Sequence, residues 1–396
     1  MDPERHVARA VDRSSGNRTA GRGSDPCSQS ASSTPFLWPL IMTASASAAA
    51  ASFFKDLAAS WLEPAQGAWI APEPQWSTEN AVALELSSMQ LRDFSTRAQG
   101  QATLVCAPYA LHGATIADFA PGHSLVEVLR RAGLSRVFVT DWRSATPDMR
   151  FFSIDNYLAD LNVTVDELKP PVDLIGLCQG GWLALAYAAR FPEKVGRLVL
   201  AGAPIDFHAA ESDLSLMVAN LPLAAFENLV RLGEGRVLGS HVLDAWAPVL
   251  DAGEADRVLQ ISSDCDARSL HDVEERFRAW YAWTVNLPGP YFLQTVDCLY
   301  KQNQLAEGKF VALGRRIDLA DVHSPLFLLA ARDDELVAAE QLFAAARLVS
   351  SAKEGIEIAT EPCGHLGLFL GARTLAGNWS RIAHWLSQDR RIAMAS

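Results

Sequence analysis

The sequence predicts an α/β protein with a mainly parallel central sheet, helices on both faces and an inserted, mostly helical segment. Beyond Asn80, short apolar segments alternate with helical patterns, which is typical of parallel sheets built from strand-helix-strand units. The strand candidates are continuously rich in Val, Leu and Ile, as expected for strands buried on both faces. Between residues 206 and 304 helical patterns and aromatic residues replace this alternation, which indicates an insertion between two strands.

The individual elements follow from these patterns. Helices are expected between the strands, among them Ser124 to Ala132 and Trp182 to Arg190. The strand candidates are Ala102 to Ala107, Arg136 to Thr140, Val172 to Leu177, Leu198 to Ala201, Pro325 to Ala330 and Gly355 to Ala359.

Composition divides the chain into five segments. The first, residues 1–50, is rich in Ser, Ala, Arg and Gly without apolar periodicity, so a disordered tail is expected, and Met42 stays open as an alternative start. The other segments are an N-terminal helix and loop (51–80), the first part of the α/β core (81–205), the cap (206–304) and the second part of the core (305–396). A cap inserted over the active edge of a sheet usually governs access and substrate choice.

Charge and cysteine content exclude several classes of partner. The chain has 396 residues, 49% of them apolar, and a formal net charge of -12. This charge argues against nucleic acid or an anionic membrane surface, because both require a basic surface on the protein. The six cysteines lie far apart without a CxxC pair, so no metal site or disulfide framework is expected and a cytoplasmic location is favoured. The most apolar stretch, residues 37–54, is too rich in Ala, Ser and Thr for a transmembrane helix.

The strongest motif is Gly176-Leu177-Cys178-Gln179-Gly180-Gly181, which follows a strand candidate and opens an Ala-rich helix. A G-x-C-x-G at such a junction is the nucleophile elbow of the α/β-hydrolase fold, with cysteine in place of serine. The glycines are needed because a Cβ at those positions would collide with the neighbouring strand and helix. The turn also places the Cys178 thiol at a helix N-terminus, whose positive end favours the thiolate. A structural cysteine in a glycine-rich turn is the alternative interpretation.

The partners of a cysteine nucleophile are expected on two later loops. An α/β-hydrolase fold supplies its acid after a later strand and its histidine after the last one. Asp334 follows the strand candidate at 325–330, and His365 follows the one at 355–359. We therefore expect His365 to act as general base on Cys178 and Asp334 to orient its imidazole. Asp333 is adjacent, and only motif register favours Asp334 over it.

A tetrahedral oxyanion needs two hydrogen-bond donors. One is expected to be the backbone N–H of Gln179, directly after the nucleophile. The other is expected in the loop after the first core strand, at Pro108-Tyr109-Ala110, where Tyr109 is central and the donating amide stays open.

Several segments together resemble the polyhydroxyalkanoate synthases, a family of the α/β-hydrolase superfamily. IADFAPGHSLVEVLRRAGLSRVFVTDWRS resembles their Asp-x-x-Pro-x-x-Ser-Leu-Val segment and following strand, and GLCQGGWLALAYAARFPEKV resembles their nucleophile box, especially that of the short class III enzymes. The similarity runs from about residue 76 to 386. Glu335 departs from the histidine usual in synthases after the acid. The segments that look like the synthase cap exit and its following turn are Asn286 to Pro290, Tyr300 to Leu305 and Leu313 to Leu319.

The resemblance implies transfer of a 3-hydroxyacyl group from coenzyme A onto the cysteine and then onto a growing polyester. Either His365 or Asp334 would then deprotonate the attacking 3-hydroxyl. No cofactor is implied beyond the coenzyme A thioester that serves as substrate, and no metal. Trp182 and Trp283 are candidate substrate-binding residues, although packing inside the cap accounts equally well for Trp283 and for its neighbour Trp280. A place at the surface of cytoplasmic polyester granules is compatible with this function, as is either a homodimer or a complex with a partner subunit.

Two alternative functions stay open. The first is a cysteine-nucleophile hydrolase on the same scaffold, an intracellular polyhydroxyalkanoate depolymerase or a thioesterase, in which water accepts the acyl group. Asn286 to Pro290 and Gly180-Gly181 favour the synthase over this hydrolase. The second is a non-catalytic scaffold protein with a relic site, which predicts a broken triad, whereas the sequence retains all three residues.

Overall fold

The computed structural model describes residues 71–246, 254–261 and 267–393. The expected tail, residues 1–50, lies outside the described residues, as does the expected helix that follows it. Within the described ranges, no helix combines the length and the apolar character needed to cross a membrane.

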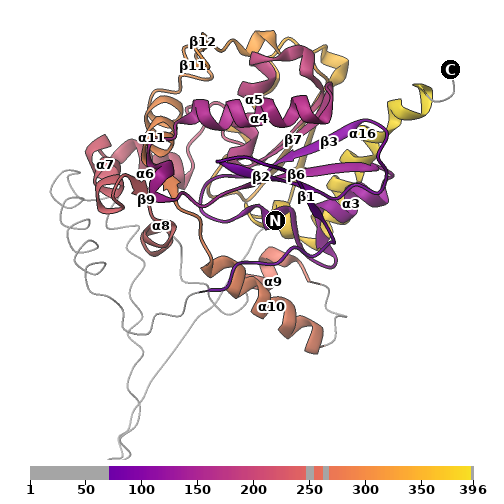
Figure 1. The fold of residues 1–396 in the computed structure, drawn as a ribbon, viewed down its shortest axis with the longest axis horizontal. Coiled ribbons are helices and arrows are strands. Elements are labelled where there is room, and N and C mark those ends of the chain that lie inside the picture. Colours follow the sequence, from indigo (N-terminus) through magenta and orange to yellow (C-terminus); the bar gives the residue numbers. More distant parts are fainter. Residues whose placement is uncertain (1–70, 247–253, 262–266, 394–396) are drawn as a thin grey trace, which may run out of the picture. The chain divides into compact units, whose positions relative to one another are not determined.

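An eight-stranded sheet forms the centre of the fold (Figure 1). Its strands lie in the order β1-β2-β6-β3-β7-β8-β13-β14. β2 pairs antiparallel with β1 and β6, and all pairs from β6 to β14 are parallel. The α/β-hydrolase fold predicted from the sequence is therefore confirmed. The strands are β1 Ala81–Glu85, β2 Met89–Asp93, β3 Ala102–Cys106, β6 Arg136–Trp142, β7 Val172–Leu177, β8 Val195–Ala201, β13 Leu326–Ala331 and β14 Ile356–Glu361.

The register of the parallel strands brings their carboxyl ends to one edge of the sheet. Leu177, the last residue of β7, lies opposite Ala201 of β8, and Ala201 lies opposite Leu329 of β13. Ala331 of β13 lies opposite Glu361 of β14. Side chains that directly follow these strands therefore emerge at the same edge, where open α/β sheets bind their ligands.

The apolar strands were predicted more accurately than the outer ones. All six predicted strands are present; the one expected at Leu198 begins at Val195, and the one expected to end at Thr140 continues to Trp142. β1 and β2 were not predicted individually. β1 is mostly exposed and β2 has the mixed sequence MQLRD, so neither carries the continuous apolar signal of a buried strand.

Helices cover both faces of the sheet, with α4 and α5 on one side and α3 and α16 on the other (Figure 1). Helix α3 begins where Ser124 Oγ accepts a hydrogen bond from the backbone N–H of Glu127 (2.9 Å), and the same hydroxyl donates to buried Asp118 (2.6 Å). The helices of the core are α3 Leu125–Arg131, α4 Ile154–Leu168, α5 Gln179–Arg190, α12 Ala339–Phe343, α13 Ala345–Leu348, α14 Gly367–Leu370, α15 Ala372–Thr374 and α16 Ser380–Ala393.

Short elements complete the core. The two-residue or three-residue strands lie outside the central sheet and form separate antiparallel pairs. They are β4 Asp118–Ala120 with β5 His123–Ser124, and β11 Val311–Ala312 with β12 Arg315–Arg316. The single-turn and π-helical segments are η1 Ala114–Ala117, η2 Pro147–Phe151, η3 Pro192–Lys194, η5 Leu319–Asp321, η6 Lys353–Gly355 and η7 Leu375–Trp379.

The segment between β8 and β13 is mostly helical. Its two ends are tied together, because Asn303 Nδ2 donates to Asp206 Oδ1 (2.8 Å) and Asn303 Oδ1 accepts from the backbone N–H of Phe207 (3.0 Å). The described elements are α6 Asp213–Asn220, α7 Leu223–Leu232, β9 Arg236–Val237, α8 Gly239–Trp246, α9 Glu254–Leu259, α10 Ala267–Ala282, β10 Leu287–Pro288, α11 Gly289–Gln294 and the π-helix η4 Thr295–Lys301.

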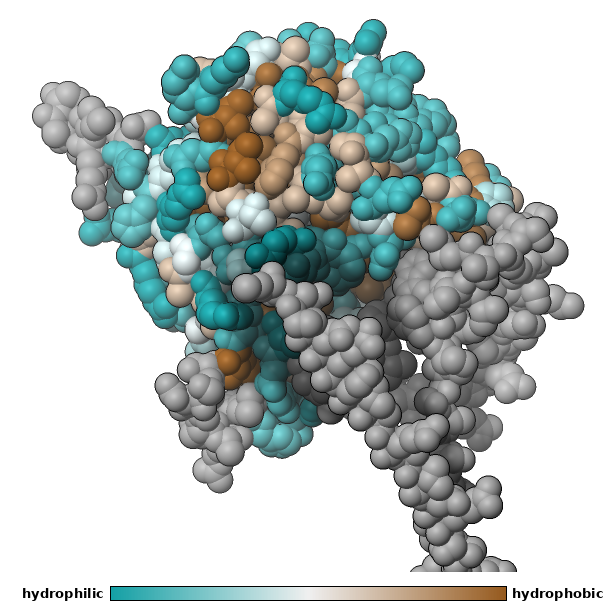
Figure 2. Space-filling model, turned by 180° about the vertical axis from the view of Figure 1, so that it is seen from behind, coloured by the Kyte–Doolittle hydropathy of each residue, from teal (hydrophilic) through white to brown (hydrophobic). Residues whose placement is uncertain are grey.

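Hydrophilic residues surround limited hydrophobic areas on the face of the protein in Figure 2. Single exposed apolar side chains are ordinary on folded proteins and indicate no binding surface by themselves. The large exposed ones among the described residues come from separate elements, and they are Val82, Phe151, Val163, Leu232, Val311, Leu336 and Ile358.

Candidate active site

Cys178 lies in a sharp turn between β7 and α5. Its backbone has φ 48° and ψ -121°, a conformation that residues with a Cβ rarely adopt. The backbone N–H of Cys178 donates to the carbonyl of Ala201 (2.8 Å), which ties the turn to the end of β8. The side chain is half-buried and stands at the first turn of α5, as a nucleophile elbow requires.

The glycines around Cys178 allow three chain segments to approach closely. A Cβ on Gly180 would lie 2.2 Å from the carbonyl oxygen of Cys106, and one on Gly176 would lie 2.5 Å from the Cα of Gly181. A Cβ on Gly181 would lie 2.3 Å from the Cβ of Ala203. Real Cβ atoms do not approach other atoms this closely, so each position requires glycine for the turn to keep its present packing.

His365 and Asp334 form a buried pair beside the elbow. His365 follows β14, Asp334 follows β13, and the imidazole Nδ1 donates to the carboxylate Oδ2 at 2.7 Å. Only 4% of the His365 side chain and 1% of the Asp334 side chain are exposed. Asp334 Oδ1 accepts from the backbone N–H groups of Leu336 and Val337, both at 2.9 Å, which fixes the carboxylate in place.

The Cys178 side chain lies near enough to the imidazole of His365 for its charge to act on that ring. Since Nδ1 is engaged by Asp334, Nε2 is the nitrogen left to accept a proton. Burial alone would lower the pKa of His365, but the charges of Asp334 and Cys178 and the hydrogen bond to Asp334 hold it well above its usual value. A proton released by the thiol therefore has a stable position on this imidazole.

Of the two adjacent carboxylates, the structure brings Asp334 to the histidine and leaves Asp333 at the surface. The Asp333 side chain is 62% exposed and lies beside Arg332, with 3.5 Å between Oδ1 and Nε. Of the two side chains that follow β13, only that of Asp334 therefore reaches the histidine after β14. The arrangement of Cys178, His365 and Asp334 can support nucleophilic catalysis, in which the histidine transfers the proton and the acid orients it.

Glu335 is a third carboxylate residue, directly after Asp333 and Asp334 in the chain. Partial burial of its carboxylate and the charge of Asp334 raise the pKa of Glu335. Its own backbone N–H and the charge and backbone N–H of His365 lower it, and the net result is a raised pKa. Its carboxylate lies close to Gly364, one residue before the histidine. This position was noted in the sequence only as a departure from the synthases.

The two residues predicted to supply oxyanion donors are Gln179, at the start of α5, and Tyr109, in the loop after β3. Gln179 is the first residue of α5, so its backbone N–H has no partner within the helix and points out of its N-terminus. The Tyr109 side chain, 1% exposed, instead anchors the loop after β3, because its hydroxyl donates to the carbonyls of Arg143 (2.9 Å) and Asn286 (3.1 Å). Its backbone N–H stays a predicted donor.

The two candidate substrate-binding tryptophans lie apart from each other. Trp182 has no exposed surface and packs in α5 with its ring centroid 6.3 Å from that of Tyr291, so it belongs to the core. Trp283 is half-buried and covers Gly113, where an added Cβ would meet its ring at 2.7 Å. Trp280 is 1% exposed and packs against Phe119, which supports the packing interpretation for this residue.

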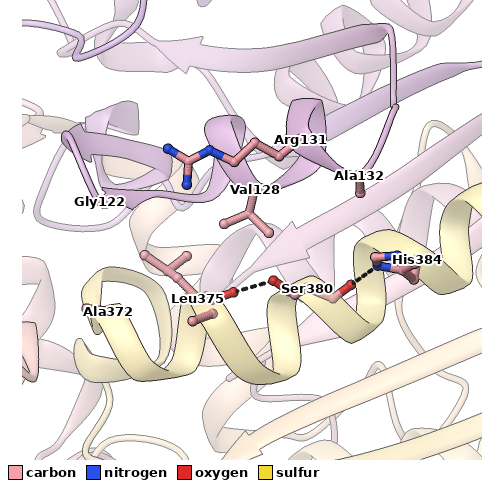
Figure 3. Close-up of a pocket in the computed structure, with 9 residues that line it drawn as sticks. Gly122, Val128, Arg131, Ala132, Ala372, Leu375, Ser380 and His384 are labelled. Carbon is pink, nitrogen blue, oxygen red and sulfur yellow. Dashed lines mark hydrogen bonds between the residues drawn. The ribbon is translucent and has the colours of Figure 1, made fainter.

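A cavity of about 300 Å³ lies elsewhere, between α3 and the C-terminal helices (Figure 3). None of the three residues Cys178, His365 and Asp334 lines it. Its lining residues are Gly122, Val128, Arg131, Ala132, Ala372, Leu375, Ala376, Ser380 and His384. Within residues 71–246, 254–261 and 267–393, no group of three or more His, Cys, Asp or Glu side chains is arranged to hold a metal ion.

Comparison with known proteins identifies the family. The model of the family described as "Protein of unknown function (DUF3141)" matches residues 83–388, which include the elbow, the acid and the histidine. The chain belongs to this family. The match extends over both parts of the core and the whole segment between them, so the DUF3141 family shares the region in which the candidate site lies.

This DUF3141 protein is also similar to curated proteins named poly(3-hydroxyalkanoate) polymerase subunit PhaC. The one from Synechocystis sp. is 29% identical over 297 residues, which cover 68% of this chain and 74% of the relative. The one from Haloferax mediterranei is 24% identical and covers 78% and 64%, so less than two thirds of that relative is spanned. The one from Allochromatium vinosum is 26% identical and covers 64% and 71%.

Solved structures are more distant. A monoacylglycerol lipase from Paleococcus ferrophilus is 17% identical, covers 76% of this DUF3141 chain and 98% of its own, and superposes with a TM-score of 0.49. The assignment of the fold therefore depends on the strand order and register described above.

Proposed function

We propose that this protein is an acyltransferase that polymerises 3-hydroxyacyl-CoA into polyhydroxyalkanoate through an acyl-cysteine intermediate. The observation that supports the proposal is the buried hydrogen bond between His365 and Asp334 at the sheet edge where the turn at Cys178 also lies, in a chain similar to PhaC subunits. The coenzyme A thioester is the substrate, and no other cofactor is proposed.

In the first half-reaction the acyl group moves from coenzyme A to the protein. His365 Nε2 takes the proton of the Cys178 thiol, and the sulfur attacks the thioester carbonyl. The Gln179 N–H stabilises the resulting oxyanion. When the carbon–sulfur bond to coenzyme A breaks, the leaving thiolate recovers the proton from His365. One thioester replaces another, so the acyl group stays activated.

In the second half-reaction a hydroxyl group accepts the acyl group. His365 removes the proton from the 3-hydroxyl of the incoming unit or chain end, whose oxygen then attacks the carbonyl carbon on Cys178. The carbon–sulfur bond breaks, an ester forms, and the proton on the imidazole returns to sulfur. Asp334 keeps the imidazole oriented and stabilises its charged form in both half-reactions.

Incubation with 3-hydroxybutyryl-CoA tests the reaction. Release of free coenzyme A together with polymer would support the synthase, whereas release of free 3-hydroxybutyrate would identify a thioesterase. Loss of amorphous polyester without any reaction of the thioester would identify a depolymerase. Cys178→Ala is expected to abolish the activity, and Cys298→Ala, which removes another half-buried thiol, is the matched control.

Alkylation by iodoacetamide tests whether Cys178 is activated. Burial raises the pKa of Cys106 and of Cys363 to about 12, and it also raises the pKa of Cys298. A raised thiol pKa leaves less thiolate at neutral pH, so these three cysteines should react slowly. We expect Cys178 to be alkylated first among the described cysteines. Equal labelling of the accessible cysteines would instead indicate a relic site.

The names of the relatives bear on the assembly state, and the proposed polyester product bears on the location of the protein. The PhaC relatives are named as subunits, and we propose that this chain acts as a homodimer or with a partner subunit, at the surface of the insoluble polyester that it makes. Size-exclusion chromatography combined with the polymerisation assay tests the assembly, since full activity in a monomer fraction would contradict it.

A further inference from the structure

Two consecutive peptide groups of the loop after β13 hold the carboxylate of Asp334. The backbone N–H groups of Leu336 and Val337 both donate to Asp334 Oδ1 at 2.9 Å. They belong to the peptides that join Glu335 to Leu336 and Leu336 to Val337. Since the other oxygen of Asp334 accepts from His365 (2.7 Å), the geometry of the acid and the histidine depends on where these two peptides lie.

The segment between β8 and β13 holds the same two peptides by their carbonyl groups. The backbone N–H of Asp213 donates to the carbonyl of Glu335 (2.9 Å), and Ser212 Oγ donates to the carbonyl of Leu336 (2.9 Å). In a planar trans peptide the C=O and the N–H point in opposite directions. A hydrogen bond to each carbonyl therefore also fixes the direction of the N–H that reaches Asp334.

The hydroxyl of Ser212 also begins helix α6. Ser212 is 8% exposed, and its Oγ accepts from the backbone N–H of Ser215 (3.2 Å). In return, the backbone N–H of Ser212 donates to Ser215 Oγ (2.7 Å), which completes a capping box. A hydroxyl group has one proton, and that of Ser212 is donated to Leu336. One side chain thus caps α6 and attaches it to the loop of the acid.

Further contacts fix the position of α6. Before the helix, Gln341 Nε2 of α12 donates to the carbonyls of Ala210 (2.8 Å) and Phe207 (3.2 Å). Near the other end of the helix, Lys301 Nζ donates to the carbonyl of Val218. The Ser212 hydroxyl therefore reaches the acid loop from an element that is held on both sides, as the support of a catalytic group requires.

We propose that Ser212 is a positioning residue whose hydroxyl, acting through the peptide between Leu336 and Val337, holds Asp334 in the orientation that faces His365. The segment between β8 and β13 thereby supports the acid. The inference rests on the proposed function, in which Cys178 is acylated with the help of this pair, and it adds a residue that does not itself touch the substrate.

Acylation of Cys178 by two acyl donors tests the assignment. Wild-type protein and Ser212→Ala are mixed separately with 3-hydroxybutyryl-CoA and with 4-nitrophenyl acetate, and the mass of the acylated protein is followed in time. Loss of the one neutral hydrogen bond that holds the acid loop should slow acylation about tenfold. Ser212→Thr, which keeps a hydroxyl at this position, should restore the wild-type rate.

Two further variants separate positioning of the acid from support of the helix. Ser215→Ala is the matched control, because it removes the other half of the capping box and leaves the bond from Ser212 to Leu336 in place. It should leave the acylation rate unaltered. In an Asp334→Ala background, Ser212→Ala should cause no additional slowing, since no carboxylate remains to be held.

The outcomes distinguish this assignment from the proposed function. The assignment is overturned if Ser212→Ala acylates at the wild-type rate, if Ser215→Ala is slowed equally, if Ser212→Thr stays slow, or if Ser212→Ala slows the Asp334→Ala protein further. If neither donor acylates Cys178 in the wild type, the proposed function and the assignment fail together. If only 4-nitrophenyl acetate acylates it, the proposed function fails, and slowing of that reaction in Ser212→Ala but not in Ser215→Ala still supports the assignment.

Discussion

The packing of the elbow predicts that a substitution at Ala203 restores the stability that a substitution at Gly181 removes. In Gly181→Ala the new methyl group would lie 2.3 Å from the Cβ of Ala203, and its next neighbours, the Gly176 carbonyl oxygen and the Ala203 Cα, would lie at 3.4 and 3.6 Å. There is therefore one severe clash, and its partner is a single methyl group. Removing that methyl group in Ala203→Gly should make room for the alanine at 181.

The size of the effect follows from the kind of contact. Forcing an extra methyl group into a packed interior costs about 1–3 kcal/mol, whereas alanine gains about 1 kcal/mol over glycine inside a helix. Gly181→Ala should therefore lower the free energy of unfolding by up to about 2 kcal/mol. In a double-mutant cycle with Ala203→Gly, the double variant should be more stable than the sum of the single changes by about 1–3 kcal/mol.

Urea unfolding of the four proteins in the cycle measures this coupling. The rate of Cys178 alkylation provides a second measurement, because any movement of α5 displaces the sulfur from His365. Gly377→Ala is the control for a glycine in a helical segment, since an added Cβ there meets no atom within 4 Å. A coupling free energy below about 0.5 kcal/mol, the usual error of additivity, would refute the reasoning.

Three further predictions concern the site and its support. Asp334→Asn should slow acylation of Cys178 by about 10²–10⁴-fold because the imidazole loses its orienting carboxylate, whereas Asp333→Asn, a change at an exposed residue, should leave the rate unaltered. The raised pKa of His365 contributes stability that is complete below about pH 6.5 and is lost as pH rises through the raised value. The difference in urea midpoint between wild type and His365→Gln should therefore shrink at alkaline pH. Ser124→Ala should lower the free energy of unfolding by about 1–2 kcal/mol, measured in urea, without changing acylation.

The centre of the fold could be predicted because its residues are buried on both faces. β7 and β13 are continuously apolar, and they were predicted within one residue of their observed bounds. The same reasoning fails at the edge of the sheet. β1 is mostly exposed and is held by pairing with β2, and β2 buries only Met89 and Leu91 in a five-residue strand, so neither strand has a continuous apolar run.

The site could be predicted only as far as its motifs extend. The elbow carries its own glycine pattern, and Asp334 and His365 follow apolar strands, so the sequence predicts all three positions. The choice between Asp333 and Asp334 depends on the direction in which the chain turns after β13, which the sequence does not encode locally.

The backbone of Cys178 implies that reactivity and folding compete at this position. With φ at 48°, the cysteine occupies a conformation that disfavours any side chain, at a cost of about 1–3 kcal/mol. Glycine would adopt the same angles freely, so a chain with Cys178→Gly should withstand more denaturant than one with Cys178→Ala, although neither can carry an acyl group. The sulfur is thus retained at a point where thermodynamic stability alone would favour its removal.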